Sequence, residues 1–281
     1  MKLEATISPS QADMQVIRDG LSAFNVAKVS SLLQLSDDEV LVLVRDDSGQ
    51  IMGGAIGEFD WGYLFIDTVW VKDSARGLGH ATRIMQAIEG YAARQGIQRA
   101  YLATTTFQAK PLYEKLGYQV FGEIPEHPLA NTMYYLWKDN LAPTATELEI
   151  QSPPNPADFN FLNQALIDDI ALHVPLNMSR YAVFLRDAVG LLHGGLWGYF
   201  YWDWFDLRFL WMSDAVRSQG FGKEAMQMLF EECKQRGTIG IKTDTADFQS
   251  LSFYQSLGFE VYGTLNNRPL GHSSYFIKKL L

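Results

Sequence analysis

The sequence predicts a mixed α/β fold made of two copies of one unit. Segments with the apolar pattern of strands alternate with segments of helical spacing along all 281 residues. A gap-free internal repeat, displaced by 141 residues as from Arg76 to Arg217, relates 45–138 to 186–279. Roughly 27 positions are identical between them, far above chance. At roughly 100–200 residues per domain, the chain length also fits two domains.

The first copy is expected to begin with a short strand and an amphipathic helix. The strand covers residues 3–7, and the helix lies around 10–25, where apolar residues recur at helical spacing. The second copy begins in the same way at a displacement of 145 residues, as from Asp13 to Asp158.

Three strands and a long helix form the centre of each copy. In the first copy we expect strands at 40–45, 51–58 and 63–71, the last rich in aromatic residues. A glycine-bearing turn then opens a helix over 79–95, which Gly96 ends. The remaining elements are a strand at 100–104, a helix at 109–116 and strands at 118–122 and 132–138. The second copy repeats this order.

The boundary between the copies is predicted in a stretch rich in proline and polar residues. Three prolines stand there among Thr, Ser and Asn, a composition typical of a linker. We therefore expect an N-terminal domain over 1–142 and a linker over 143–156, whose end overlaps the first strand of a C-terminal domain over 146–281.

Composition excludes several classes of function. Acidic residues outnumber basic ones, 32 to 23, and the formal net charge of −9 makes nucleic-acid binding a poor hypothesis. The first residues lack the apolar stretch of a signal peptide, and no window approaches the length of a membrane span. The single cysteine, Cys233, excludes a disulfide framework, and we expect it to be a packed thiol. The histidines lack metal-ligand spacing and are expected at the surface or in loops: His127, His173, His193 and His272. We expect a cytoplasmic protein with no metal, nucleic-acid or membrane partner.

A short loop between the aromatic strand and the long helix carries the clearest functional signal. It reads RGLGHA over 76–81 and RSQGFG over 217–222. Small residues let the backbone approach a ligand, and the unpaired amide groups at a helix start attract phosphate. The glycines fit neither the G-x-G-x-x-G fingerprint nor the P-loop. Both copies are therefore predicted to hold a phosphate-binding loop of another kind.

Both loops resemble the acetyl-CoA loop of the GNAT N-acetyltransferase superfamily, Gln/Arg-x-x-Gly-x-Gly/Ala. A second family signature is similar to FQAKPLYEKLGY over 107–118 and to FQSLSFYQSLGF over 248–259. The resemblance covers almost the whole chain and implies two tandem GNAT folds. Each would have a mostly antiparallel mixed sheet whose fourth and fifth strands separate, with the pantetheine arm between them. It also implies direct transfer of an acetyl group from acetyl-CoA to an amine.

The resemblance also implies which residues hold acetyl-CoA. They are the end of the aromatic strand and the loop in each copy: Val69, Trp70, Val71, Arg76, Gly77, Leu78, Gly79, His80 and Ala81 in the first, and Leu210, Trp211, Met212, Arg217, Ser218, Gln219, Gly220, Phe221 and Gly222 in the second.

Candidate catalytic groups follow from the chemistry. The resemblance places a proton donor for the departing thiolate at Tyr113 and Tyr254. A base for the amine is sought on one face of the aromatic strand, because alternate residues share a face. Asp67 and Asp206 are the candidates, and Arg208 stands where the first copy has Asp67. Two other interpretations stay open. Each of the two acids could be a buried structural group, and Asp206 could serve only to pair with Arg208.

These features predict an acetyl-CoA-dependent N-acetyltransferase acting on a small-molecule amine. The first copy is favoured as the catalyst, although both loops are expected to bind CoA. The change from Asp67 to Arg208 predicts a cationic amine at the first site and a neutral or acidic ligand, or none, at the second. Two alternatives remain: acetylation of a protein amine, such as a ribosomal amino terminus, and a CoA-binding or scaffold module in which at least the second copy is not catalytic. The assembly is expected to be a monomer with pseudo-dimeric halves or a homodimer.

Overall fold

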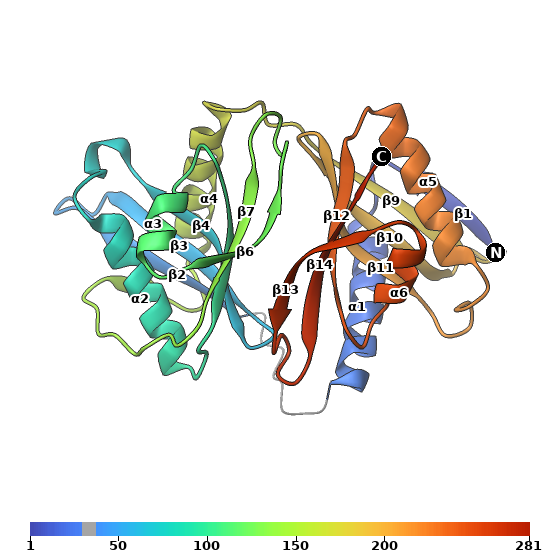
Figure 1. Ribbon diagram of the computed structural model, residues 1–281, viewed down its shortest axis with the longest axis horizontal. Helices are drawn as coiled ribbons and strands as arrows, with labels where there is room; N and C mark the ends of the chain where they lie inside the picture. Colours follow the sequence, from blue (N-terminus) through green and yellow to red (C-terminus); the bar gives the residue numbers. More distant parts are fainter. Residues whose placement is uncertain (30–37) are drawn as a thin grey trace.

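Two seven-stranded sheets, each flanked by helices, make up the part of the chain that the computed structural model describes, residues 1–29 and 38–281 (Figure 1). In spatial order, the first sheet contains β6 (Gln119–Ile124), β7 (Met133–Lys138), β5 (Ala100–Thr105), β4 (Tyr63–Val71), β3 (Ile51–Asp60), β2 (Glu39–Arg45) and β8 (Glu149–Gln151). The second sheet contains β1 (Lys2–Thr6), β9 (Met178–Arg186), β10 (Leu192–Tyr201), β11 (Trp204–Met212), β12 (Gly240–Ala246), β14 (Ser273–Leu280) and β13 (Glu260–Asn266). One central pair in each sheet, β4–β5 or β11–β12, is parallel, and the other pairs are antiparallel. The mixed α/β class is confirmed.

The helices lie where the periodicity predicts them, within a few residues at each end. They are α1 (Gln11–Lys28), α2 (His80–Arg94), α3 (Lys110–Lys115), α4 (Pro156–Ala171), α5 (Phe221–Gln235) and α6 (Leu251–Ser256). Ser10 caps α1, because its hydroxyl oxygen accepts a hydrogen bond from the amide of Asp13 at 3.1 Å. Within residues 1–29 and 38–281, no helix has the length and apolar character needed to cross a lipid bilayer.

The two copies exchange their first strand and helix. β1 comes from the first copy but extends the second sheet, where Ala5 pairs with Val183 of β9. β8 comes from the second copy but extends the first sheet, where Ile150 pairs with Val42 of β2. α1 packs on β10 and β11, and α4 packs on β3 and β4, so the blue α1 lies in the right half of Figure 1. Each folded unit therefore joins the first strand and helix of one copy to the remaining elements of the other.

Matching ion pairs hold the exchanged segments at the sheet edges. Arg45 of β2 contacts Glu149 of β8 at 2.8 Å and Asp158 of α4 at 2.7 Å. At the matching position, Arg186 of β9 contacts Asp13 of α1 at 2.7 Å. These side chains are partly exposed, and exposed ion pairs add little to the free energy of unfolding. The pairs therefore serve mainly to position the exchanged strands and helices against the sheet edges.

Each sheet buries one face beneath a long helix. Ile84 and Ile88 of α2 are fully buried against the first sheet, and Met226 and Leu229 of α5 are fully buried against the second. Cys233, also on α5, is a buried free thiol in the second core, as the sequence predicts.

The two sheets meet at their outer strands β6 and β13 about a pseudo-two-fold axis. Gly122 of β6 lies against Tyr262, and the matching Gly263 of β13 lies against Phe121. A Cβ atom added to Gly122 or Gly263 would approach the facing ring to 3.0 or 2.9 Å, so the close approach of these strands requires glycine. The contact is self-complementary, like the interface of a symmetric dimer, although both sides belong to one chain.

Buried polar groups lie beside this contact. Arg268 Nε donates to Asp60 of the first copy at 3.0 Å, and its Nη1 donates to Asp244 at 2.9 Å. His127 occupies the matching position in the first copy, beside Asp203 at 3.5 Å, and is fully buried. Of the two settings expected for His127, the surface or a loop, the structure shows the second. Two tryptophan rings of the second copy pack against this histidine.

Candidate active site

The two parallel strands at the centre of each sheet separate part-way along their length. β4 and β5 pair only as far as Ile66 and Leu102. β11 and β12 pair only as far as Asp206 and Lys242. Beyond these residues the strands diverge and leave backbone groups of β4 and β11 free to meet a ligand. The separation of strands that the family resemblance implies is therefore present in both units.

A β-bulge follows directly after the point of divergence. Ile56 pairs with Thr68 and Gly57 pairs with Ile66, so Asp67 is the extra residue of β4. In the second sheet, Arg208 is the extra residue of β11 by the same register shift. Bulges bend a strand and redirect a side chain, and they are frequent beside active sites. The two side chains on which the copies differ thus hold the same special position.

The predicted phosphate loops have the same geometry in both copies. Gly79 and Gly220 precede α2 and α5 with φ angles of 81° and 93°, in the left-handed region that favours glycine. Ser218 also has a left-handed φ of 62°, where the first copy has Gly77. Such a conformation costs about 1–3 kcal/mol in a residue other than glycine and is concentrated at functional sites. Both loops therefore direct the free amide groups of a helix start toward the divergent strands.

The arginine of each loop motif holds the loop to the strand before it. Arg76 Nε donates to the carbonyl oxygen of Val71 at 3.0 Å, and Arg217 Nε donates to that of Met212 at 2.8 Å. This matching bond explains why both copies keep arginine at the first motif position. Gln219 instead donates to the carbonyl oxygen of Ala215 at 2.8 Å and is not part of the cavity wall described next.

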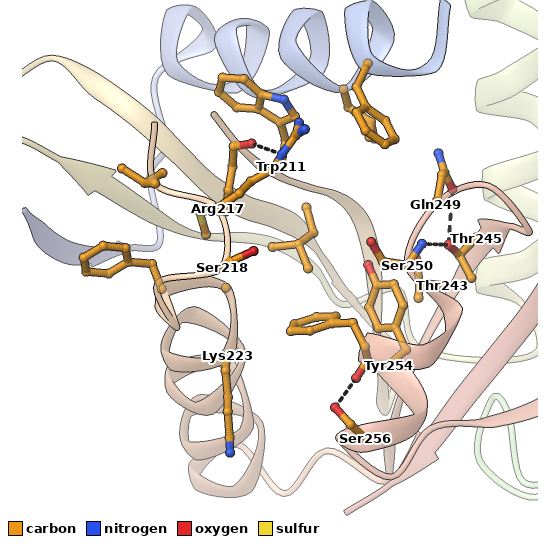
Figure 2. A pocket seen from close by; sticks show the side chains of 18 of the residues that line it. Trp211, Arg217, Ser218, Lys223, Thr243, Thr245, Gln249, Ser250, Tyr254 and Ser256 are labelled. Carbon is orange, nitrogen blue, oxygen red and sulfur yellow. Dashed lines mark hydrogen bonds between the residues drawn. The ribbon is translucent and has the colours of Figure 1, made fainter. Parts of the chain in front are cut away.

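A cavity of about 500 Å³ opens between the divergent strands of the second unit (Figure 2). It is lined by the end of β11, the loop, the first turn of α5, β12 and α6. Figure 2 shows Ser218 and Tyr254 pointing into the opening, whereas Lys223 runs along α5 away from Tyr254. The predicted residues of the second site that line it are Leu210, Trp211, Met212, Arg217, Ser218, Gly220, Phe221, Gly222 and Tyr254.

The exchanged helix α1 forms one wall of this cavity. Leu21 and Phe24 line it, and the Phe24 ring lies 4.6 Å from the guanidinium carbon of Arg217. Gln249 Nε2 donates to Asn25 Oδ1 at 2.7 Å, which joins α1 to the segment before α6. Gly20 lies so close to the Trp211 ring that an added Cβ atom would approach it to 2.4 Å. The second site is therefore completed by a helix from the first copy.

The first site receives α4 in the same way but with different chemistry. Asp169 of α4 forms an ion pair with Arg76, where the second site has Phe24 against its arginine. His173, just after α4, stacks on Phe107 with 5.1 Å between ring centroids. Each loop arginine also pairs with an exposed aspartate three residues before it, Asp73 or Asp214. The exchanged helices add a second carboxylate beside the first loop and a neutral aromatic ring beside the second.

Most of the other residues predicted at the first loop are packed against the core or against α4, and Leu78 is exposed to solvent. Trp70 packs edge-on against Phe161 of α4, and Val71 is buried in the first core. Val69 and Ala81 are partly buried against the same core. Leu78 is exposed, and the Nδ1 atom of His80 is buried without a hydrogen-bond partner among the described residues.

The two candidate proton donors are buried tyrosines on α3 and α6. Tyr113 and Tyr254 each keep 7% of their surface exposed. Burial raises the pKa of Tyr113 to about 12 and also raises the pKa of Tyr254. Neither hydroxyl group has a hydrogen-bond partner in residues 1–29 and 38–281, so each is protonated at neutral pH and free to donate.

The two candidate bases differ in their surroundings. Asp67 is the bulge residue of β4. Desolvation raises the pKa of its carboxyl group against the opposing effects of Arg208 and Thr68. Asp206 lies at the point of divergence, 3.7 Å from both Arg208 and Lys242. Desolvation would raise the pKa of Asp206, but Lys242 and Arg208 outweigh it and hold the pKa below its usual value. A lowered pKa makes a weaker base, which favours the pairing interpretation of Asp206.

Sequence reasoning missed the residues that other segments bring to these sites. Leu21, Phe24 and Asp169 come from the exchanged helices, and Asp244 comes from β12 without belonging to any motif. The sequence does contain a sign of one such difference. Phe24 and Asp169 occupy matching positions at the displacement of 145 residues, and only Asp169 is charged. In the part of the chain that the structure describes, no group of three His, Cys, Asp or Glu residues could hold a metal ion.

The sequence is similar to those of known acetyltransferases. The model of the acetyltransferase (GNAT) family matches residues 15–118 and 146–259, one segment in each copy. A blasticidin-S acetyltransferase of Streptomyces morookaense is 32% identical over 33% of this chain and 69% of its own length. An acetyltransferase of Agrobacterium fabrum is 29% identical over 44% of this chain and 86% of its own length. The crystal structure of an acetyltransferase from Bacillus cereus is 24% identical over 46% of this chain and 94% of that one, with a TM-score of 0.44.

Proposed function

The chain belongs to the GNAT acetyltransferase family, and from this premise we propose that it moves an acetyl group from acetyl-CoA to a primary amine of a small molecule. The observation that carries this proposal is the second cavity. There the phosphate loop, the divergent strands and the unpartnered hydroxyl group of Tyr254 border one space of about 500 Å³. A space of this size, walled on one side by α1, suits a small acceptor better than a protein surface.

The residues of the second site fit acetyl-CoA. The amide groups after Gly220 would bind its pyrophosphate, since the start of a helix attracts anions. The edge of β11 beyond Asp206 is free of its parallel partner and would hydrogen-bond the amide groups of the pantetheine arm. The first site has the same loop and the same strand separation, so we propose CoA binding there as well.

Acetyl-CoA supplies the acetyl group as a thioester. Before it attacks, the acceptor ammonium group must lose a proton to a base, for which Asp67 is the candidate at the first site, either directly or through water. The amine nitrogen then bonds to the carbonyl carbon, the bond from that carbon to sulfur breaks, and the nitrogen releases its second proton to solvent to leave a neutral amide. Tyr254, or Tyr113 at the first site, donates its hydroxyl proton to the thiolate and recovers one from solvent. The products are an N-acetylated amine and CoA.

Turnover against a panel of amines tests the proposal. The full chain is mixed with acetyl-CoA and either small-molecule amines or peptides with free amino termini, and released thiol is measured. Thiol release with small amines supports the proposal, and release only with peptides favours the protein-acetylating alternative. Calorimetry with CoA gives the number of sites per chain, for which we expect two. CoA binding without turnover of any amine would favour a binding module.

A further inference from the structure

Arg208 lies at the inner end of the second cavity, away from the phosphate loop. It is the bulge residue of β11, two residues beyond the last β11–β12 pair, and it lines the cavity. Met212, at the loop end, lies four positions further along β11, which at about 3.3 Å per residue is roughly 13 Å. At this distance Arg208 is too far from the loop to contact the pyrophosphate, which Arg217 and the start of α5 would meet. Arg208 lies instead where the two strands diverge.

The guanidinium group of Arg208 keeps capacity for another anion. Its side chain is 53% exposed, and its ion pair with Asp206 is loose, with 3.7 Å between Nη1 and Oδ2. The same Oδ2 atom lies 3.7 Å from Nζ of Lys242, so one carboxylate is shared by two cations. Arginine carries five N–H donors in a planar fork that matches the two oxygens of a carboxylate. The guanidinium group therefore has N–H donors left for a second carboxylate beside the loosely held Asp206.

A carboxylate lines the same cavity from the other diverging strand. Asp244 of β12 has a side chain that is 47% exposed. Arg268 Nη1 donates to Asp244 Oδ2 at 2.9 Å and so orients the carboxylate from the interface between the sheets. The two strands thus present a cation on β11 and an anion on β12 to the space between them. An amine that also carries a carboxylate has the complementary pair of charges.

We propose that the second site selects acceptors that carry a carboxylate near the reacting amine, and that Arg208 binds this carboxylate while Asp244 attracts the amine. The inference rests on the proposed acetyl transfer and adds the class of acceptor. The first site has Asp67 and Ala103 at the matching positions and lacks this arrangement of charges. The two sites of the chain therefore take acceptors of different charge.

Two CoA thioethers separate this proposal from the proposed function. In one probe the sulfur is joined through an acetyl-length bridge to glycine, which ends in a carboxylate. The other ends in glycinamide, which is neutral. Calorimetry on the full chain measures the affinity of CoA and of each probe. The measurements are repeated for Arg208→Ala and Arg208→Lys, and for Arg180→Ala as the control, which removes an exposed arginine of β9 outside the cavity.

We expect the glycine probe to bind about 10-fold more tightly than the glycinamide probe, the strength of one charge-assisted hydrogen bond. Arg208→Ala should remove this preference, Arg208→Lys should keep part of it, and Arg180→Ala should keep all of it. Equal affinity for the two probes, or a preference that survives Arg208→Ala, overturns the acceptor class while CoA binding upholds the proposed function. Failure of CoA itself to bind overturns the proposed function instead.

Discussion

Two buried tyrosines of the first unit show, at the scale of single residues, how a neighbour decides what a hydroxyl group can do. Tyr118 donates to Glu89 at 2.9 Å and so completes a buried contact. Tyr113 packs against the Tyr118 ring with 6.0 Å between centroids, but its hydroxyl group has no such partner in the described part of the chain. Only a hydroxyl group of the second kind is available to protonate a leaving thiolate. Tyr254 shares this property at the second site.

Tyr254→Phe is expected to lower kcat at the second site by about 100-fold, the low end for a general acid. Acetyl-CoA affinity and the free energy of unfolding should change little, because no hydrogen bond within the described residues is lost. Thiol release, calorimetry and urea unfolding measure the three quantities. Tyr118→Phe serves as the control and should cost about 1 kcal/mol of stability without a loss of kcat. An unchanged kcat in Tyr254→Phe would mean that water or another group protonates CoA. The same change at Tyr113 shows whether the first copy, favoured by the sequence, also catalyses.

Asp169 places a negative charge beside the first phosphate loop, and its removal should strengthen CoA binding there. Asp169→Asn is expected to tighten binding several-fold, a modest effect because Arg76 and Asp169 are partly exposed. Calorimetry in a Gly220→Glu background, which blocks the second loop, isolates the first site. Asp168→Asn, on the neighbouring exposed residue of α4, is the matched control and should leave the affinity as it was. Weaker binding in Asp169→Asn would indicate that the ion pair with Arg76 holds the loop in its binding shape.

His127 should make the protein sensitive to mild acid. Burial lowers its pKa to about 4 in the folded state, whereas the unfolded chain takes up this proton near pH 6.5. The stabilising contribution is therefore complete above pH 6.5 and is lost as the pH falls toward 4, by about 3 kcal/mol in total. Urea unfolding of the wild type and of His127→Phe between pH 7 and pH 5 tests this. The wild type should lose stability over that range, and His127→Phe should lose less. His173→Gln, which removes an exposed histidine stacked on Phe107, should follow the wild type; equal slopes for all three proteins would refute the assignment to His127.

At the scale of helices and strands, the sequence predicts where each element begins and ends, but it does not predict which sheet the first strand of each copy joins. Apolar periodicity and the stop at Gly96 give the bounds of most elements within a few residues, because each signal lies inside the element that it marks. The choice of sheet edge for β1 and β8 is not local. Leu3-Glu4 and Leu148-Glu149 carry the same pattern, so either strand fits either edge. For the same reason motifs indicate the loop glycines and the candidate Tyr254, whereas no motif places Phe24 or Leu21 of the exchanged helix at the second cavity.

The contact between Gly20 of α1 and Trp211 gives the exchanged helix its position over the second site. An added Cβ atom would lie 2.4–2.6 Å from three atoms of the indole ring, so Gly20→Ala must move α1 or the ring. We expect a loss of about 1–3 kcal/mol in stability, which exceeds the gain in helix propensity of about 1 kcal/mol. Weaker CoA binding should follow at the second site only. Ser22→Ala, at an exposed position of α1, is the control. If Gly20→Ala stabilises the protein, the helix is free to shift and does not set the shape of the cavity.

For the molecule as a whole, the exchange of segments makes the two sequence copies interdependent. The contact of β6 with β13 joins the two units at their outer strands, and the exchange also joins them through the sheets themselves. Arg268 adds a buried hydrogen bond from the second copy to Asp60 of the first. Asp60 is the last residue of β3, just before the strand β4 that leads to the first site. In such a chain a side chain at one site can be substituted, as between the matching positions of Asp67 and Arg208. The strand and helix supplied by the other copy continue to support the fold of that unit.

Residues 1–145 and 146–281 expressed separately test this interdependence. The second fragment lacks β1 and α1, so β9 becomes an open edge and the cavity loses the wall formed by Leu21 and Phe24. The first fragment lacks β8 and α4 in the same way. We expect neither fragment to give a stable monomer, and we expect the mixture to form a one-to-one complex that binds CoA, because each fragment supplies the strand and helix that the other needs. Size-exclusion chromatography, circular dichroism and calorimetry follow the assembly, with the intact chain as the reference. A monomeric 146–281 fragment that binds CoA as tightly as the intact chain would show that its own β8 and α4 can take the places of β1 and α1, and that the exchange is not required for the site.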